Sequence, residues 1–443
     1  MIRPDGASPR RAREPIAIDP ATRRKDQHRV FPSAPLQGPI RSGENRAEQR
    51  SSGVKIMLRV RRIRVSTGPL GIVAEASTMG RILLYHLSDI HIGSHHLGTE
   101  SNIHAGRDGH HFQTARALQD SVMGQKFSRR DFGITADDRT AMVVGGDLTR
   151  IGSDYDFHLT HTFLKAKIAW HKDRSGAVDE LGLAWPEALF TVPGNHDHWQ
   201  GFRPDLKMLW KRPSSWRKIV IPQGLAALTR PPAFNPNLTP DYFEPTPWHH
   251  TITARDGTFA VELFGVDSNS GLQGHPTNFR AVGEISDEQL YGVAAGNAKK
   301  GLQQFLDEAH QKATVPSVAA IVCHHAFANN GGLTDARPLS NASRVSLLAL
   351  ARQYRVRAVL TGHVHYFLEY KWNAVAPRVW EIRCGTTLQL GSPKQKFRPG
   401  YYVHVFSLDP GKTGWDSLNW RAWQYRSQNG GTFIRNANFK PVD

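Results

Sequence analysis

Five short apolar runs, each followed at once by polar side chains, constrain the fold of this 443-residue chain more than any other feature of its sequence. They occupy residues 81–87, 141–144, 189–193, 318–323 and 356–360. Short apolar runs that end in Gly or polar residues are typical of buried strands. In an open α/β sheet, ligand-binding side chains gather beyond the carboxyl ends of the strands. The sequence therefore predicts an α/β fold in which the residues after these runs form one polar site.

The side chains that follow the five runs are of the types that bind divalent metal ions. In chain order the motifs read Asp89-Ile90-His91, Gly146-Asp147, Gly194-Asn195-His196-Asp197, His324-His325 and Gly362-His363-Val364-His365. Each residue taken alone is more often a turn, a cap or a buried core residue. Unrelated turns, however, have no reason to place such residues after five separate strands. Mixed nitrogen and oxygen ligands suit Mn, Fe, Zn, Co or Ni, so the motifs predict a metal site.

The five motifs in this order resemble those of the calcineurin-like metallophosphoesterase family, and the resemblance covers about residues 79–408. It implies a four-layer αββα sandwich, with two mixed sheets packed face to face and helices on the outside. It also implies two divalent metal ions in the loops at one edge of the sandwich. By this resemblance the first ion is bound by Asp89, His91 and His365, the second by Asn195, His324 and His363, and both by the bridging Asp147.

The resemblance further implies an activity, the hydrolysis of a phosphomonoester or a phosphodiester by in-line attack of a hydroxide that bridges the metal ions. His196 would remain free of metal and act as a general acid or charge stabiliser near the leaving-group oxygen. Asp197 would support His196. Arg150 and Asn330 are further candidates for contact with the substrate.

The residues around Asp147 narrow the resemblance within the family. Arg150 stands where a purple acid phosphatase would have Tyr and a Ser/Thr protein phosphatase would have Asp-Arg-Gly. The Gly-Asp-Leu-Thr motif at 146–149, with a Gly shortly after it, is closer in style to bacterial cyclic-nucleotide phosphodiesterases. Within the His-His pair, His325 is a less favoured ligand than His324. Three alternatives stay open: a DNA or RNA nuclease, a non-enzymatic metal-binding scaffold, and a module with a single metal ion.

The positive charge of the chain is concentrated at its N-terminus. Residues 1–78 contain 16 of the 56 Lys and Arg and 7 of the 39 Asp and Glu, so this segment carries +9 of the formal charge of +17. Its low apolar content predicts disorder. An Arg-rich arm attracts nucleic acid or anionic lipid, although a solvated segment without a partner is the favoured interpretation. Translation from Met79, directly before the first run, is a further alternative.

The composition also bears on where the protein is found. No run approaches the roughly 18 apolar residues that a membrane helix needs, and no apolar segment of a secretory signal follows the basic start. The sequence therefore predicts no membrane span and a cytoplasmic protein. Cys323 and Cys384 are the two cysteines, and both are expected to be small buried residues outside any disulfide framework.

Three parts are expected along the chain: a basic extension at 1–78, a metallophosphoesterase domain at 79–408 and a C-terminal extension at 409–443. An irregular, aromatic-rich insert at about 200–250 resembles a lid. Apolar periodicity and turn residues within the domain predict helices at 112–122, at 155–170 and after Ser286, a hairpin at 251–266, and closing strands at 378–384 and 401–408.

Overall fold

The computed structural model describes residues 80–93, 112–128, 131–149, 154–171, 178–198, 244–272, 282–293, 299–328, 337–372, 379–389, 391–392, 395–396, 398–427 and 431–439. Several predictions fall outside these residues. They concern the basic extension at 1–78, most of the insert at 200–250, and the candidate substrate contacts Arg150 and Asn330.

The first sheet has six strands, three of which come from the predicted apolar runs. In spatial order its strands are β16 (Phe433–Phe439), β15 (Leu418–Ser427), β14 (Gly400–Leu408), β1 (Ile82–Leu87), β2 (Arg139–Val144) and β5 (Ala188–Thr191). The strands β1, β2 and β5 are parallel, so their carboxyl ends lie at the same edge. The other three strands pair antiparallel, beginning with β14 against β1.

The second sheet also has six strands and contains the other two runs. In spatial order its strands are β10 (Leu368–Lys371), β11 (Trp380–Arg383), β9 (Ala358–Thr361), β8 (Ser317–Val322), β7 (Ala260–Gly265) and β6 (Trp248–Thr253). Four parallel strands, β11, β9, β8 and β7, form its centre. The edge strands β6 and β10 are antiparallel to their neighbours.

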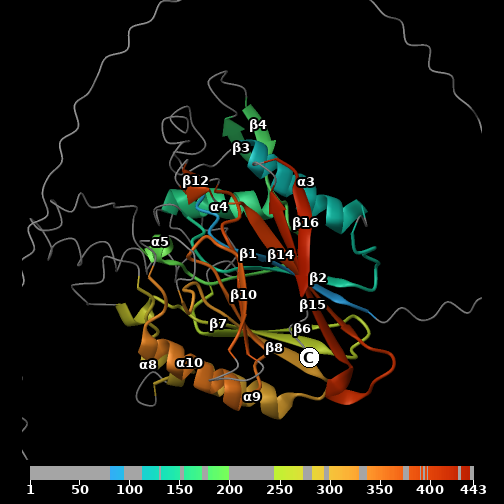
Figure 1. The fold of residues 1–443 in the computed structure, drawn as a ribbon, viewed down its shortest axis with the longest axis vertical. Helices are drawn as coiled ribbons and strands as arrows, with labels where there is room; N and C mark the ends of the chain where they lie inside the picture. The colour runs from blue at the N-terminus through green and yellow to red at the C-terminus, as the bar shows by residue number, and fades with distance from the viewer. Residues whose placement is uncertain are drawn as a thin grey trace, which may run out of the picture. The chain divides into compact units, whose positions relative to one another are not determined.

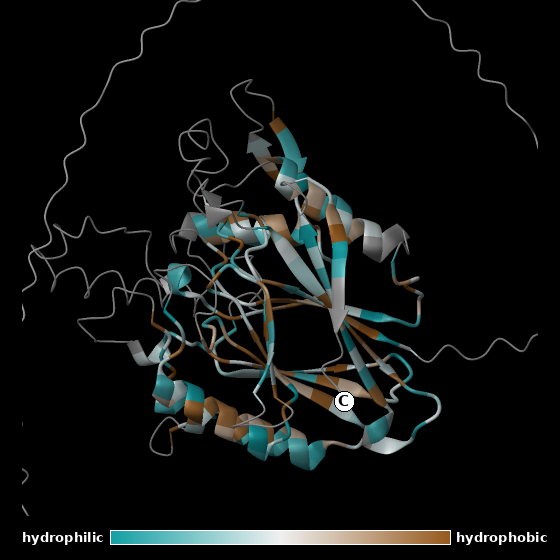
Figure 2. Cartoon of the chain, in the orientation of Figure 1, coloured by the Kyte–Doolittle hydropathy of each residue, from teal (hydrophilic) through white to brown (hydrophobic). Residues whose placement is uncertain are grey.

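Helices cover the outer face of each sheet (Figure 1). The helices α3 (Phe112–Ser128) and α4 (Asp154–Lys165) lie on the first sheet, and α8 (Asp287–Tyr291), α9 (Leu302–Lys312) and α10 (Asn341–Gln353) lie on the second. Hydrophobic residues recur along the strands of both sheets (Figure 2). Together these layers confirm the predicted αββα sandwich.

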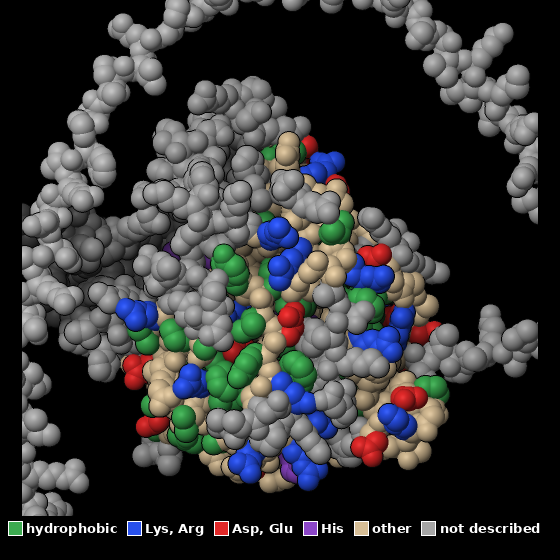
Figure 3. All heavy atoms as spheres, in the orientation of Figure 1, with side chains coloured by type: hydrophobic (Ala, Val, Ile, Leu, Met, Phe, Trp, Pro, Cys, Tyr) green, Lys and Arg blue, Asp and Glu red, His purple; other side chains and the backbone are tan. Residues whose placement is uncertain are grey.

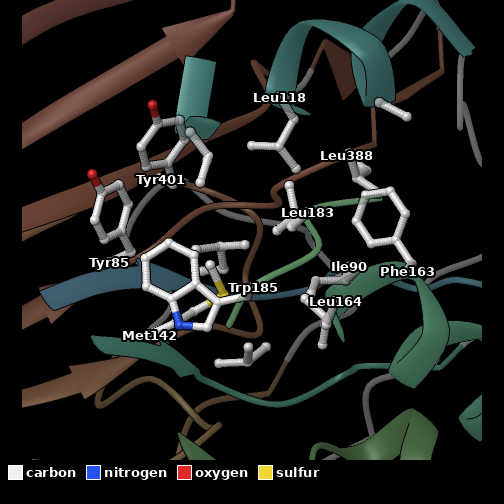
Figure 4. Packing of buried hydrophobic residues seen from close by; sticks show 14 of the residues in the cluster. Tyr85, Ile90, Leu118, Met142, Phe163, Leu164, Leu183, Trp185, Leu388 and Tyr401 are labelled. Atoms are coloured by element: carbon white, nitrogen blue, oxygen red, sulfur yellow. The ribbon is translucent and has the colours of Figure 1, made fainter. Parts of the chain in front are cut away.

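Side chains of β1 show how the layers are held together. Because successive strand residues face opposite sides, Leu83 and Tyr85 point to the helices while Ile82 and Leu84 point to the second sheet. On the helix side, the ring of Tyr85 lies 5.1 Å from the ring of Trp185, in the cluster shown in Figure 4. A strand that is buried on both faces explains why this run lacks an alternating polar pattern.

Several local predictions are confirmed. The hairpin forms from β6 and β7, and the Ser286 hydroxyl accepts a hydrogen bond from the Gln289 N–H at the start of α8. Cys323 and Cys384 are both buried. No helix within the part of the chain that the structure describes is long and apolar enough to cross a membrane.

Two local predictions are wrong. The helix predicted at 155–170 ends at Lys165, and residues 168–171 form the strand β3 (Ile168–His171), which pairs with β4 (Val178–Leu181). Ile168 and Trp170 are buried while Ala169 is exposed, so the burial period is that of a strand. The predicted C-terminal extension contains β15 and β16, which continue the first sheet through β14.

Two histidines are buried in the space between the sheets, where a charge is costly. His86 on β1 and His404 on β14 have ring centroids 5.6 Å apart, and Trp420 Nε1 donates a hydrogen bond to His404 Nδ1 at 3.2 Å. Burial lowers the pKa of His86 to about 3 and holds the pKa of His404 well below its usual value. Both rings are therefore neutral in the folded protein at neutral pH.

We predict that His404→Phe makes the stability of the protein less sensitive to acid. Below about pH 6.5 the unfolded chain binds a proton at His404 that the folded protein excludes, which lowers the free energy of unfolding by about 1.4 kcal/mol for each pH unit. The variant lacks this contribution. Denaturant titrations between about pH 7 and pH 5 should therefore give a shallower loss of stability for the variant than for the wild type.

Phe406→Leu serves as the control, because it removes packing between the sheets without changing a titratable group. It should lower the free energy of unfolding equally at each pH. Equal pH slopes for the wild type and His404→Phe would contradict the prediction.

Candidate metal centre

The predicted ligands all lie just beyond the carboxyl ends of parallel strands. In the first sheet, Asp89 and His91 follow β1, Asp147 follows β2, and Asn195 begins the short helix α5 (Asn195–His198) after β5. In the second sheet, His324 follows β8, and His363 and His365 follow β9. Backbone hydrogen bonds hold the first two loops together, from Asp89 N–H to the Gly146 carbonyl and from His91 N–H to the Asp147 carbonyl. The topology thus brings the five motifs to one edge of the sandwich.

One group of donors consists of Asp89, His91 and His365. The distance from His365 Nε2 to Asp89 Oδ1 is 3.2 Å, and the distance from His91 Nε2 to His365 Nε2 is 3.3 Å. One donor atom from each of the three residues lies within 4.8 Å of the others. We call this set the first group.

A second group consists of Asp147, His324 and His363, with Asn195 beside them. His324 Nε2 lies 3.3 Å from Asp147 Oδ2, 3.0 Å from Asn195 Oδ1 and 3.2 Å from His363 Nδ1. Asp147 also reaches the first group, because its Oδ2 lies 3.6 Å from His91 Nε2. The structure therefore brings together all seven residues that the sequence predicted as ligands.

His196 lies beside both groups and is more accessible than they are. The ring centroid of His196 is 4.7 Å from that of His91. The backbone N–H of His196 donates a hydrogen bond of 2.8 Å to Asp147 Oδ1. Its side chain also comes within metal-binding reach of His91 and Asp147. His196 is half-buried, whereas the seven ligand candidates are at most 8% exposed. A molecule that enters from solvent can therefore contact His196.

The backbone of this site is strained. Asp89, His91, Asp147, His363 and His365 have φ values of 51°, 54°, 49°, 73° and 57°, which L-residues rarely adopt. Among the described residues, only Ala184 and Arg355 are other non-glycine residues with positive φ. Such conformations cost about 1–3 kcal/mol each and cluster at functional sites. The strain independently marks these loops as a site.

The charges of the site fit divalent cations. Burial opposes ionisation of Asp147, but neighbouring histidines, chiefly His324, hold the pKa of this carboxyl well below its usual value. Burial would lower the pKa of His324, yet Asp147 raises it to about 9. Burial and His324 together hold the pKa of His363 well below its usual value. An ionised carboxylate beside neutral imidazoles is the donor set that a divalent metal takes, and a bound metal replaces the His324 proton.

Asp197, predicted to support His196, lies between the loop after β2 and the loop after β5. Its carboxylate accepts hydrogen bonds from the N–H groups of Gly194, Leu148 and Thr149 and from the Thr149 hydroxyl. These bonds tie the loop after β2 to the loop after β5. Burial and the nearby Asp147 raise the pKa of Asp197 to about 6. Asp197 thus joins the loop that carries Asp147 to the loop that carries Asn195.

His325 is buried beside the second group, and its Nδ1 atom faces Ser268. The Ser268 hydroxyl lies 2.8 Å from His325 Nδ1 and accepts a hydrogen bond from the His325 N–H. The hydroxyl proton is therefore free to bond Nδ1, which leaves the proton of a neutral ring on Nε2. The ring packs against His363 with a centroid distance of 4.3 Å. The Nε2 atom of His324, in contrast, lies within 3.3 Å of donor atoms of Asp147 and Asn195.

Sequence analysis missed three hydroxyl side chains around Asp89. The Ser88 hydroxyl donates a hydrogen bond of 2.6 Å to Asp89 Oδ2. The hydroxyls of Thr386 and Thr387, which follow β11, donate to the carbonyls of Asp89 and Ser88. Ser88 directly precedes the first motif, so its position in the sequence could have identified it as a neighbour of Asp89. The two threonines lie almost 300 residues further along the chain, so no local pattern connects them to it.

Glycine 362 marks the closest approach between loops of the two sheets. A Cβ atom on Gly362 would lie 1.8 Å from Ser88 Oγ and 2.6 Å from Asp89 Oδ2. The next residue, His363, donates its N–H to both carboxylate oxygens of Asp89, at 3.2 and 3.0 Å. The Gly-His-x-His motif therefore needs Gly because the Asp89 side chain occupies the space of any larger residue.

Residues 82–367 match the family model of the calcineurin-like phosphoesterases, and the chain belongs to this family. Its fold and its clustered metal-binding side chains agree with the metal-dependent phosphoester hydrolysis of that family.

Individual relatives are distant. The 3',5'-cyclic adenosine monophosphate phosphodiesterase CpdA of Haemophilus influenzae is 25% identical over 134 residues, which are 30% of this chain and 44% of CpdA. The chain thus matches less than half of the length of that relative. GAP50 of Plasmodium, the anchor in the inner membrane complex, gives a TM-score of 0.42 at 13% identity, over 80% of this chain and 88% of GAP50. The NAD nucleotidase of Haemophilus influenzae gives a TM-score of 0.32 at 10% identity, over 81% of this chain and 50% of the nucleotidase. The two structural matches carry no argument about activity.

We predict that Gly362→Ala weakens metal binding by about 10-fold to 100-fold, the range seen when residues that orient metal ligands are changed. The added methyl group would push Ser88 and Asp89 away from His363. Isothermal titration of the metal-free protein with Mn²⁺ or Zn²⁺ measures the affinity. Gly411→Ala is the matched control, because its Cβ would meet just one atom, Asp409 Oδ1 at 3.6 Å, an ordinary contact distance. Unchanged affinity in Gly362→Ala would show that the two loops can separate without loss of the site.

Proposed function

We propose that this protein hydrolyses phosphodiesters at a centre of two divalent metal ions, held by the first and second groups and bridged by Asp147. The position of Asp147 carries the proposal. Its Oδ2 lies 3.3 Å from His324 Nε2 in the second group and 3.6 Å from His91 Nε2 in the first. One carboxylate oxygen that faces both groups has the geometry of a bridging ligand.

The surroundings of Asp147 fix this orientation. The His196 N–H bonds the other oxygen, Oδ1, and so limits rotation of the carboxylate. The left-handed backbone at Asp147 directs the side chain into the site, and Asp197 holds the adjoining loop. Such preorganisation lets ligands bind metal without a large rearrangement.

Bound divalent cations at such a site neutralise the anionic phosphoryl group and supply a water of lowered pKa. The residues of the chain provide the remaining requirements. Asp89 and Asp147 give two negative charges that retain the cations, and the buried imidazoles exclude bulk water from them. His196, the accessible histidine, is placed to donate a proton to the leaving-group oxygen.

The similarity to CpdA and the Gly-Asp-Leu-Thr motif favour a phosphodiester, and a cyclic nucleotide in particular, over a phosphomonoester. A nuclease is less favoured. Over half of the formal charge falls in residues 1–78, and on the face drawn in Figure 3 the described Lys and Arg side chains lie scattered among other types. Hydrolysis of bis-p-nitrophenyl phosphate, p-nitrophenyl phosphate, cyclic nucleotides and DNA, each with several metals, would identify the substrate class.

We predict that Asp147→Asn lowers kcat by about a thousandfold or more and removes one of two bound metal equivalents. The amide cannot supply the negative charge that both cations share, and a loss of several kcal/mol of transition-state stabilisation corresponds to such a decrease. Elemental analysis of the purified protein and turnover of bis-p-nitrophenyl phosphate measure both effects. Asp120→Asn, which changes an exposed carboxylate of α3, is the control. Full activity of Asp147→Asn with both metals retained would rule out the bridging role.

We also predict that the effect of His196→Gln depends on the leaving group. An alkoxide such as the ribose oxygen of a cyclic nucleotide needs a proton, whereas p-nitrophenolate leaves readily without one. The variant should therefore lose about 10²–10⁴ in kcat with a cyclic nucleotide and much less with bis-p-nitrophenyl phosphate, at unchanged metal content. Equal losses with both substrates would contradict the role of His196 as a proton donor.

A further inference from the structure

We propose that β11 and the turn after it, residues 381–387, form a positioning element whose two ends hold the two groups of metal ligands. We call it the 381–387 segment. Its Arg383 end holds the loop of His324, and its Thr387 end holds the loop of Asp89. The inference rests on the proposed two-metal function, but it assigns these roles to residues that lie outside the metal-ligand motifs.

At the first end, Arg383 and Glu381 hold the backbone that follows His324. Arg383 is 0% exposed, and its Nη2 donates hydrogen bonds of 2.7 Å to the Ala328 carbonyl and 2.8 Å to Glu381 Oε1. Glu381 Oε1 in turn accepts the Phe327 N–H at 3.0 Å. The two charged side chains thus bond the backbone of two successive residues, Phe327 and Ala328. Their directional bonds fix where that loop leaves β8, which packing alone would not do.

The charged pair is costly for stability. Arg383 Nη1 and Glu381 Oε2 are buried and have no hydrogen-bond partner among the described residues. A buried ion pair with unsatisfied atoms is often less stable than apolar residues of similar volume. The hydrogen bonds of the pair to Phe327 and Ala328 give it a part in holding the loop after His324.

At the second end, the turn after β11 holds the loop after β1. The Thr387 hydroxyl donates to the Ser88 carbonyl at 2.8 Å and accepts the Ser88 N–H at 3.1 Å. The Thr387 N–H also donates to the Ser88 carbonyl, and the Thr386 hydroxyl donates to the Asp89 carbonyl, both at 3.0 Å. Four hydrogen bonds therefore fix the peptide groups on either side of the strained Asp89.

The Arg383 end lies in β11, and the Thr387 end lies in the turn that follows this strand. Within β11, Arg383 lies opposite Thr361 of β9, and the Cys384 N–H donates to the Thr361 carbonyl at 2.8 Å. The strand β9 leads directly to His363, which bonds Asp89 and approaches His324. The 381–387 segment is therefore tied to the loops of β1, β8 and β9, which carry ligands of both groups.

The experiment measures Co²⁺ affinity in proteins that retain one group at a time. His365→Ala disables the first group, so Co²⁺ then reports the second, and His324→Ala does the reverse. Arg383→Met should lower the Co²⁺ affinity about 10-fold to 100-fold in the His365→Ala background and by less than about twofold in the His324→Ala background. Thr387→Val should show the opposite pattern. Absorption spectra of bound Co²⁺ and calorimetric titration give the affinities.

Conservative variants separate positioning from general loss of structure. Arg383→Lys and Thr387→Ser, which keep a donor, should recover part but not all of the affinity in the affected background. Arg352→Met, at an exposed position of α10, should change neither affinity. If Arg383→Met fails to fold, Arg383→Lys must still lower the Co²⁺ affinity of the second group and not that of the first. An unchanged Co²⁺ affinity of both groups in Arg383→Lys would then overturn the inference.

The outcomes distinguish this inference from the two-metal proposal. Wild-type protein that binds one Co²⁺ would contradict the two-metal centre. The effect of the 381–387 segment would then still be measurable as a change in Co²⁺ affinity of the group that binds the ion. Variants that lower the Co²⁺ affinity of both groups equally, or of neither group, would overturn the role of the 381–387 segment even if the wild type binds two ions.

Discussion

Two ionised aspartates buried among histidines are the constraint on which the rest of this structure depends. Asp89 and Asp147 lie out of contact with bulk solvent, and imidazole nitrogens lie beside their carboxylate oxygens. Buried carboxylates are tolerated when hydrogen bonds and cations satisfy them. Backbone N–H groups of His363 and His196 supply part of that satisfaction, and a bound divalent metal would supply the rest. The left-handed backbone of the loops follows from the need to aim these groups inward.

The packing of two sheets face to face is what makes such a site available. Each sheet presents the carboxyl ends of parallel strands at the same edge, so that Asp89 and Asp147 from one sheet meet His324 and His363 from the other. The interior between the sheets is apolar enough to keep His86 neutral. A rigid apolar interior fixes the separation of the sheets and hence of the ligands.

Much of the architecture and most of the site could be predicted from the sequence, because both leave short-range signals. Apolar runs that end in polar residues gave the positions of strands such as β1 and β8, and the order of the motifs gave the family. The prediction was wrong at residues 168–171, where a run that continues a helical pattern forms β3 because its alternate side chains pack inward. It also separated β15 and β16 from the sheet, since antiparallel pairing with β14 has no local signature.

The sequence by itself determined which chemical groups are available, namely the carboxylates, imidazoles and amide of the five motifs, because side-chain chemistry does not depend on folding. The tertiary structure decided which of them meet. His91 and His365 are 274 residues apart in the chain, yet their Nε2 atoms lie 3.3 Å apart. Folding also placed the Asp197 carboxylate between two loops and gave Arg383 and Thr387 their contacts. Long-range packing, which no local pattern encodes, sets such distances.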